Sequence, residues 1–203
     1  TLLASSAASD VYKRQGIYMA QHALDEAQVV AAATELAKQI GFEAVTLTKT
    51  AAQLAIRPQS MYRYVKNTDD LKGKILAENM ALLVNQLYEQ LIGLSGEQAL
   101  TQLMMTVAFG EYTQIMPHDF AGVAKYLHYD AVREQYNRLY EMIPRLLKSL
   151  ISDADKIRRG TQLLADYMLG ESVTSRNNEN DDLTQRRADF SANIAQILAM
   201  LRN

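Results

Sequence analysis

The chain has 203 residues, of which 48% are hydrophobic and 22% are charged, and its formal net charge is −2. This length suits one large domain or two small ones, and a net-negative chain can bind nucleic acid only through a local basic patch. Because the sequence has no cysteine, disulfides, thiolate metal sites and cysteine nucleophiles are excluded.

Residues 1–18 differ in character from the rest of the chain. Their apolar stretch is only Leu2 to Ala4 and no basic residue precedes it, so they do not form a secretory signal. The segment is typical of translated sequencing-adapter read-through, and we expect a non-native or disordered leader with the natural start at Met19. No apolar run reaches the roughly 18 residues of a membrane helix, which favours a cytoplasmic protein with no membrane partner.

The composition predicts an all-α protein. Glycine and proline are scarce, with 9 and 3 residues, and they separate long runs rich in Ala, Leu, Gln and Glu. The first predicted helix spans about 25–40, where Val29 opens an apolar stripe, and Gly41 ends it. A second, short helix is predicted after an N-cap at Thr46. A third begins at Pro58, whose missing N–H costs nothing in a first turn.

A long fourth helix is predicted next. Asn67 or Thr68 is expected to cap it, and acidic residues in its first turn suit the positive end of the helix dipole. It reaches about Ile92, a length of roughly 37 Å. We therefore predict an all-α fold of about nine helices, in which a three-helix helix-turn-helix head (19–67) is joined by this long helix to a C-terminal helical bundle (68–203).

The rest of the chain reads as a bundle of longer helices. We expect Pro117 to close the first of them and Pro144 to kink the third. The polar stretch 174–182 is predicted to be a surface loop. The predicted helices beyond residue 93 cover about 96–116, 119–128, 130–151, 155–173 and 183–202.

A local basic patch does occur in the head. Two short helices joined by a tight turn match the helix-turn-helix arrangement, whose second helix enters the major groove of DNA. Charge alone is equally consistent with an ordinary solvated face, so the assignment depends on the neighbouring residues. Between residues 44 and 67 there is no acidic residue and there are four basic ones, namely Lys49, Arg57, Arg63 and Lys66.

A set of positions from the second to the fourth predicted helix forms a recognisable pattern: Thr46, Ala51, Leu54-Ala55-Ile56, Ser60-Met61-Tyr62-Arg63-Tyr64-Val65 and Asp70-Leu71. With these residues the sequence resembles the TetR family of bacterial transcriptional regulators over about residues 25–75, a quarter of the chain. Ala55 departs from the family pattern because glycine is usual there, so the turn must avoid a left-handed residue or tolerate strain. Arg57 replaces a serine-like cap, and Thr68 replaces a phosphate-binding lysine for which Lys66 is a substitute.

The resemblance implies that the head binds DNA. Tyr62 and Tyr64 would contact phosphates through their phenols, although a core position is the alternative for Tyr62. Gln59 and Ser60 stand at the start of the recognition helix, where glutamine can pair bidentately with adenine. Arg57 could take a guanine or a phosphate. The predicted DNA contacts are Thr46, Thr48, Lys49, Arg57, Gln59, Ser60, Tyr62, Arg63, Tyr64 and Lys66.

The resemblance also implies a homodimer, and helix-turn-helix proteins usually read palindromes as dimers. The last two predicted helices carry apolar stripes at helical spacing, which TetR-like proteins use for the dimer contact. Packing within one chain would give the same periodicity. The predicted interface residues are Ile157, Leu164, Tyr167, Phe190, Ile194, Ile197 and Leu201.

By the same resemblance, residues 68–203 bind a ligand and form the dimer. The region 100–170 is rich in methionine and tyrosine, which suit an adaptable apolar pocket as well as an ordinary core. A small, largely apolar effector there would bias the tilt of the fourth helix, and a coupling of about 1–3 kcal/mol is typical. The predicted ligand contacts are Met104, Ala108, Tyr112, Tyr136, Tyr140 and Met168.

No motif predicts catalysis, a cofactor or a metal. His118 and His128 match no standard ligand spacing, and the sequence has no glycine-rich phosphate loop, nucleophile elbow or HExxH motif. We therefore expect a non-enzymatic, ligand-responsive TetR-like regulator, by family habit a repressor. Its expected partners are double-stranded operator DNA, a second copy of the chain and a small effector. The alternatives are a helical carrier or enzyme with a vestigial head, and a protein–protein adaptor.

Overall fold

The computed structural model describes residues 24–110, 115, 117, 120–177 and 182–203, and every regular element among them is a helix. This confirms the predicted all-α fold. The elements, with η for 3₁₀-helices, are α2 (Glu26–Ile40), η1 (Phe42–Ala44), α3 (Leu47–Gln53), η2 (Pro58–Arg63), α4 (Thr68–Gln90), α5 (Gly96–Phe109), α6 (Phe120–Ala124), α7 (Asp130–Leu147), α8 (Ala154–Asn177) and α9 (Leu183–Arg202).

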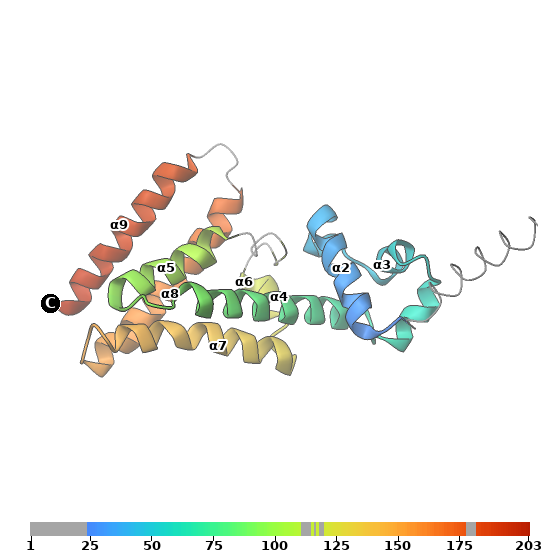
Figure 1. The fold of residues 1–203 in the computed structure, drawn as a ribbon, viewed down its shortest axis with the longest axis horizontal. Coiled ribbons are helices and arrows are strands. Elements are labelled where there is room, and N and C mark those ends of the chain that lie inside the picture. Colours follow the sequence, from blue (N-terminus) through green and yellow to red (C-terminus); the bar gives the residue numbers. More distant parts are fainter. Residues whose placement is uncertain (1–23, 111–114, 116, 118–119, 178–181) are drawn as a thin grey trace, which may run out of the picture.

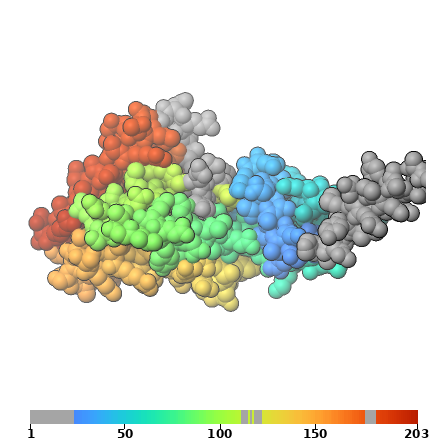
Figure 2. Space-filling view, viewed as in Figure 1, coloured from blue at the N-terminus to red at the C-terminus, as the bar shows by residue number. Residues whose placement is uncertain are grey.

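The molecule is elongated, with a small head at one end and a helical body at the other (Figure 1). The head contains α2, η1, α3 and η2, and α4 runs from it into the body, where it packs against α5 and α7. In the space-filling view the head is coloured blue to cyan and the body green to red (Figure 2). The long helix is thus the structural link between the two parts, as the sequence predicts.

The head helices begin at the caps that the sequence predicts. The hydroxyl of Thr46 accepts a hydrogen bond from the backbone N–H of Lys49 at 3.2 Å. The side-chain carbonyl of Asn67 accepts one from the N–H of Asp70 at 2.8 Å. Helix α2 ends at Gly41, whose φ of 83° is a backbone conformation that glycine adopts without strain. These local signals fix where α2 stops and where α3 and α4 start.

Two hydrophobic cores meet along α4. The head core includes Leu71, Ile75 and Met80 of this helix, together with residues of the α6–α7 connection. The body core includes Leu83 and Leu87. The first half of α4 is therefore buried in the head and the second half in the body, so one uninterrupted helix belongs to both.

The connections in the body differ from the sequence prediction. Helix α5 ends at Phe109 rather than at 116, so Pro117 does not close it. Helix α6 is also shorter than predicted, and α7 ends at Leu147. Pro144 lies inside α7, which continues for three residues beyond it.

The predicted loop 174–182 is also partly wrong, because α8 continues to Asn177. The Ser175 hydroxyl donates a hydrogen bond to the backbone carbonyl of Ala108 in α5 at 3.0 Å. The Thr174 hydroxyl donates to the carbonyl of Gly170 at 2.8 Å. A tertiary hydrogen bond therefore supports this polar segment as a helix, although it has no apolar stripe.

Ala55, in the turn between α3 and η2, has a φ of 54°, which costs a residue with a Cβ roughly 1–2 kcal/mol. We expect Ala55→Gly to raise the free energy of unfolding by about 0.5–1 kcal/mol, because the added backbone entropy of glycine offsets part of the relief. Urea denaturation measures the change. Ala52→Gly, at an exposed helical position of α3, is the control and should lower stability by about 1 kcal/mol. A loss of stability in both variants would contradict the prediction.

Candidate nucleic-acid interface

The third predicted helix forms where the sequence places it, but as the 3₁₀-helix η2 (Pro58–Arg63). Such helices occur in short pieces and have three residues per turn, so side chains at i and i+3 share a face. Met61 is fully buried and Tyr64 is half-buried, and this face packs on the head core. The face carrying Gln59 and Tyr62 is exposed, with Tyr62 65% exposed. This exposure argues against the alternative that Tyr62 is a core residue.

Other predicted DNA contacts differ in their exposure and in the hydrogen bonds that they form. Arg63 is exposed, and its guanidinium carbon lies 6.0 Å from the ring centroid of Tyr64. Ser60 is half-buried, and its backbone N–H donates a hydrogen bond to the carbonyl of Arg57. Thr48 is exposed on α3. The hydroxyl of Thr46 already accepts the capping hydrogen bond, so its structural role is established.

Four basic residues of this segment lack acidic partners. Lys49, Arg57, Arg63 and Lys66 are all exposed, and none forms an ion pair within the described parts of the chain. The Lys49 ammonium donates a hydrogen bond to the backbone carbonyl of Ala44 at 3.0 Å. The helix α3 and the segment after it thus present uncompensated positive charge on a chain whose net charge is negative.

Other cations on and beside the head are paired instead. Lys38 pairs with Glu35 at 2.6 Å, and Lys74 pairs with Glu26 at 2.6 Å. Lys72, which is largely buried, donates hydrogen bonds to the carbonyl and the carboxylate of Glu43 at 2.9 and 3.2 Å. The head cations that form ion pairs are thus distinct from the four that have no acidic partner among the described residues.

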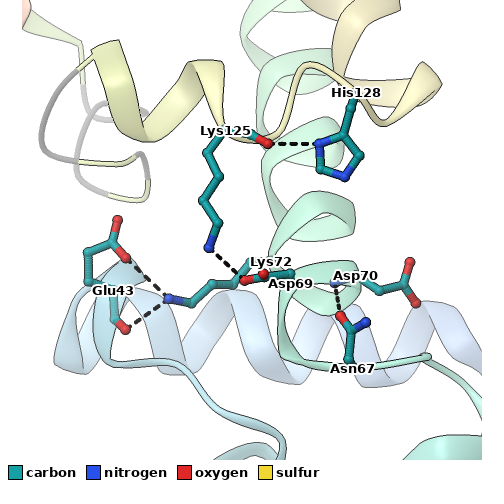
Figure 3. Close-up of polar contacts among 7 residues, drawn as sticks. All are labelled: Glu43, Asn67, Asp69, Asp70, Lys72, Lys125 and His128. Carbon is teal, nitrogen blue, oxygen red and sulfur yellow. Dashed lines mark hydrogen bonds and ion pairs between the residues drawn. The ribbon is translucent and has the colours of Figure 1, made fainter.

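A polar cluster joins the head to the body at the start of α4 (Figure 3). The Lys125 ammonium, from the α6–α7 connection, lies 2.9 Å from a carboxylate oxygen of Asp69. This hydrogen bond raises the pKa of Lys125 above its ordinary value. His128 shares a hydrogen bond of 2.8 Å with the carbonyl of Lys125. Sequence reasoning missed this cluster because Lys125 and Asp69 lie 56 residues apart, and no local pattern links them.

Aromatic side chains lie beside this cluster. Tyr126 is only 2% exposed, and its ring meets that of Phe42 edge-on with centroids 5.8 Å apart. Burial raises the pKa of Tyr126. The Tyr129 ring packs against Gly73 of α4, where a Cβ would lie 3.0 Å from a ring carbon. The α6–α7 connection is thereby packed onto the head.

The predicted ligand contacts that the structure describes lie in two different surroundings. Met104, Ala108 and Met168 lie in the body core, each at most 3% exposed. Tyr136 is half-buried and stacks on Tyr140, with ring centroids 6.2 Å apart. Burial raises the pKa of Tyr136. Tyr112 lies outside the described residues, so the pocket remains a prediction.

A groove of about 1010 Å³ does occur between the head and the body. It lies among α2, α4, α5 and the first turns of α9, and of the predicted ligand contacts none that the structure describes lines it. Its lining includes Thr34 and Lys38 of α2, Leu82 and Gln86 of α4, and Phe109 of α5. Sequence reasoning missed this groove because its walls come from four helices.

The predicted dimer residues are largely part of the core of one chain. Leu164, Phe190 and Ile194 are at most 1% exposed. The Tyr167 ring stacks on Phe190 at 4.8 Å, and its hydroxyl accepts a hydrogen bond from Asn193 at 2.8 Å. The other predicted residues, Ile157, Ile197 and Leu201, pack partly against the same core. The stripe therefore satisfies the intrachain alternative, and the dimer contact remains a prediction.

Comparison with solved structures identifies the fold. A transcriptional regulator FadR from Bacillus subtilis, in complex with stearoyl-CoA, matches with a TM-score of 0.62 and 16% identity over 87% of this chain and 97% of that chain. A TetR variant from Acinetobacter baumannii AYE, in complex with minocycline, gives 0.62 and 16% over 89% and 99%. A transcriptional regulator from Rhodococcus sp. Rha1 gives 0.63 and 13% over 88% and 96%.

These likenesses define the chain as an all-α protein with the TetR-like fold, in agreement with the resemblance seen in residues 25–75. No protein-family model matches the sequence, and the search of curated proteins found no match. Within the described ranges, no helix has the length and hydropathy needed to cross a membrane. Among the same residues, no three His, Asp or Glu side chains are grouped so that they could hold a metal ion.

Proposed function

We propose that the protein is a ligand-responsive transcriptional regulator of the TetR type that acts as a repressor on palindromic operator DNA. The observation that carries this proposal is the exposed face of η2, where Gln59 and Tyr62 project from a buried base at Met61. Four exposed cations without acidic partners flank this face, and the supporting fold is shared with known regulators.

Each part of this face has a chemical role in the proposal. Lys49, Arg63 and Lys66 neutralise phosphates, which supplies the salt-dependent part of the affinity. The phenol of Tyr62 donates a hydrogen bond to a phosphate oxygen and fixes the register on the duplex. Gln59, at the start of η2, reads a base edge, because a carboxamide can pair bidentately with adenine.

A homodimer completes the proposal, because two heads are needed to read two half-sites about one helical turn apart. The outward faces of α8 and α9 supply the contact, since Leu163 and Met200 are exposed there. Residues 19–67 form the DNA-binding part, and residues 68–203 form the part that dimerises and binds a small molecule. The proposed place of action is the cytoplasm.

Two of the similar solved structures contain a bound small molecule. The FadR structure holds stearoyl-CoA and the TetR variant holds minocycline, so this fold accommodates ligands of different shape. In this chain a small molecule in the body, or between body and head, would favour one orientation of the head. The equilibrium between two head orientations shifts only as far as the small molecule binds one of them more tightly than the other.

Fluorescence anisotropy tests the function with labelled duplexes from the DNA flanking the gene. We expect one fragment to bind at least about 1000-fold more tightly than a shuffled duplex of equal composition, a typical specificity ratio. Sedimentation equilibrium of the same sample should give a dimer, and the complex should contain two chains per duplex. Equal affinity for all duplexes, or binding as a monomer, would contradict the proposal.

A further inference from the structure

The groove between head and body combines an apolar wall with basic side chains. Along α4 its wall runs from Asn79 to Gln90, about 16 Å at about 1.5 Å per residue. Leu82, Met105 and Phe109 supply an apolar surface, and Leu82 is 56% exposed although it is a leucine. Such a surface is suited to an extended apolar group that would otherwise meet water.

The charged residues of the groove are exclusively basic among the described residues that line it. Arg187 of α9 has no ion pair within the described chain, and its guanidinium carbon lies 5.4 Å from the ring centroid of Phe109. Lys38 lines the groove from α2, with Glu35 as its partner on the same helix. Arg187 of α9 is therefore an unpaired cation beside the apolar surface of α4 and α5, an arrangement complementary to an amphipathic anion.

A third feature indicates a hydrogen-bond donor on the occupant. The Oε1 atom of Gln86 is buried without a hydrogen-bond partner in the described part of the chain. Since other atoms of Gln86 line the groove, rotation of its carboxamide would present this acceptor to an occupant. Buried acceptors are nearly always satisfied, and an exception calls for a missing partner. Nearby amides are already engaged, because Gln90 accepts a hydrogen bond from Thr106 at 2.7 Å.

We propose that this groove binds an amphipathic organic anion that also carries an N–H or O–H donor. The anionic group pairs with Arg187, the donor satisfies Gln86, and the apolar chain lies along Leu82. Since the walls come from α2 of the head and from α4, α5 and α9, the bound molecule holds the head against the body. An effect of this binding on DNA affinity rests on the function proposed above, whereas the binding itself does not.

Isothermal titration calorimetry without DNA tests the site, using three probes below their micelle concentrations. N-decanoylglycine has the chain, the donor and the carboxylate, N-decanoylsarcosine lacks the donor, and N-decanoylglycinamide lacks the charge. We expect saturable one-to-one binding of the first. The second should bind about fivefold more weakly, as expected for one hydrogen bond, and the third about tenfold more weakly, as expected for a charge-assisted pair.

Four variants assign the contacts. Arg187→Gln should weaken N-decanoylglycine about tenfold and leave the uncharged probe unchanged, whereas Arg145→Gln, an exposed arginine of α7 outside the groove, should change neither. Leu82→Gln should weaken all three probes, and Ile92→Gln, at another exposed apolar position, should weaken none.

A fifth variant tests the acceptor. Gln86→Met should abolish the difference between the glycine and sarcosine probes, because it removes the only group that the donor satisfies. Absence of saturable binding, equal affinities of the three probes, or equal effects of Arg187→Gln and Arg145→Gln would overturn the proposal. Because the titration contains no DNA, a protein that does not bind DNA can still bind the probes. The proposed groove site and the proposed DNA-binding function can therefore be refuted independently.

Discussion

The double variant Tyr62→Phe with Lys66→Ala is expected to bind its operator about a hundredfold more weakly than the wild type, a loss of about 2.7 kcal/mol. Each subunit of the proposed dimer loses one phenol and one ammonium contact to phosphates. A hydrogen bond to a charged group is worth about 1.5–3 kcal/mol, but the losses of neighbouring contacts do not add in full, so the expected total is smaller than their sum. The fold should be unaffected, because both side chains are exposed. Anisotropy titrations at fixed salt measure the change.

Salt dependence gives this prediction a second readout. The slope of log K against log salt should become shallower by about 2, because each lost lysine–phosphate contact contributes about 0.9. The matched control is Tyr88→Phe with Lys74→Ala, which removes an exposed phenol of the body and a lysine paired with Glu26. If the control weakens binding as much as the test variant, the proposed face does not carry the contacts.

Tyr126→Ala is expected to lower the free energy of unfolding by about 3–4 kcal/mol, in the range found when large aromatic side chains are removed from a core. The ring is 2% exposed and touches Phe42 and Tyr129, so its removal leaves a cavity where the α6–α7 connection meets the head. This is a large part of the stability of an ordinary domain, about 5–15 kcal/mol. Equilibrium unfolding in urea, followed by circular dichroism, measures the loss.

Tyr126→Phe provides the matched comparison, since it keeps the ring and removes only the hydroxyl. We expect it to cost less than about 1 kcal/mol, the usual net worth of one hydrogen bond. Similar losses in the two variants would mean that the hydroxyl rather than the ring stabilises the contact between the α6–α7 connection and the head. A decrease in the free energy of unfolding below about 1 kcal/mol in both variants would show that this contact does not depend on Tyr126.

The head could be predicted well because its signals are local. The caps at Thr46 and Asn67 act on N–H groups three residues ahead, and the spacing of Met61 and Val65 is enough to place them inside. The departure at Ala55 was also informative, since the backbone there keeps the positive φ that glycine would have adopted. What the sequence did not reveal is that η2 is a 3₁₀-helix, because hydrophobic spacing over six residues does not separate it from an α-helix.

The body was harder to predict because its decisive contacts join distant segments. The stripe from Phe190 to Leu201 has the periodicity of a buried face, but periodicity does not say whether the covering helix belongs to the same chain. Methionine and tyrosine suit both a core and a pocket, and Met104 proved to be core. The helical extension through Ser175 depends on a hydrogen bond to Ala108, 67 residues away.

The way α4 is shared determines where the chain can bend. Its residues up to Met80 are buried with the head, and from Leu83 onward they are buried with the body. The ring of Tyr129 seated against Gly73 also makes the α6–α7 connection travel with the head. Helix α7 is shared in the same way, with Val132 in the head core and Leu139 in the body core. Reorientation of one part against the other would therefore bend two continuous helices, α4 near Met80–Leu83 and α7 between Val132 and Leu139, rather than turn about a loop.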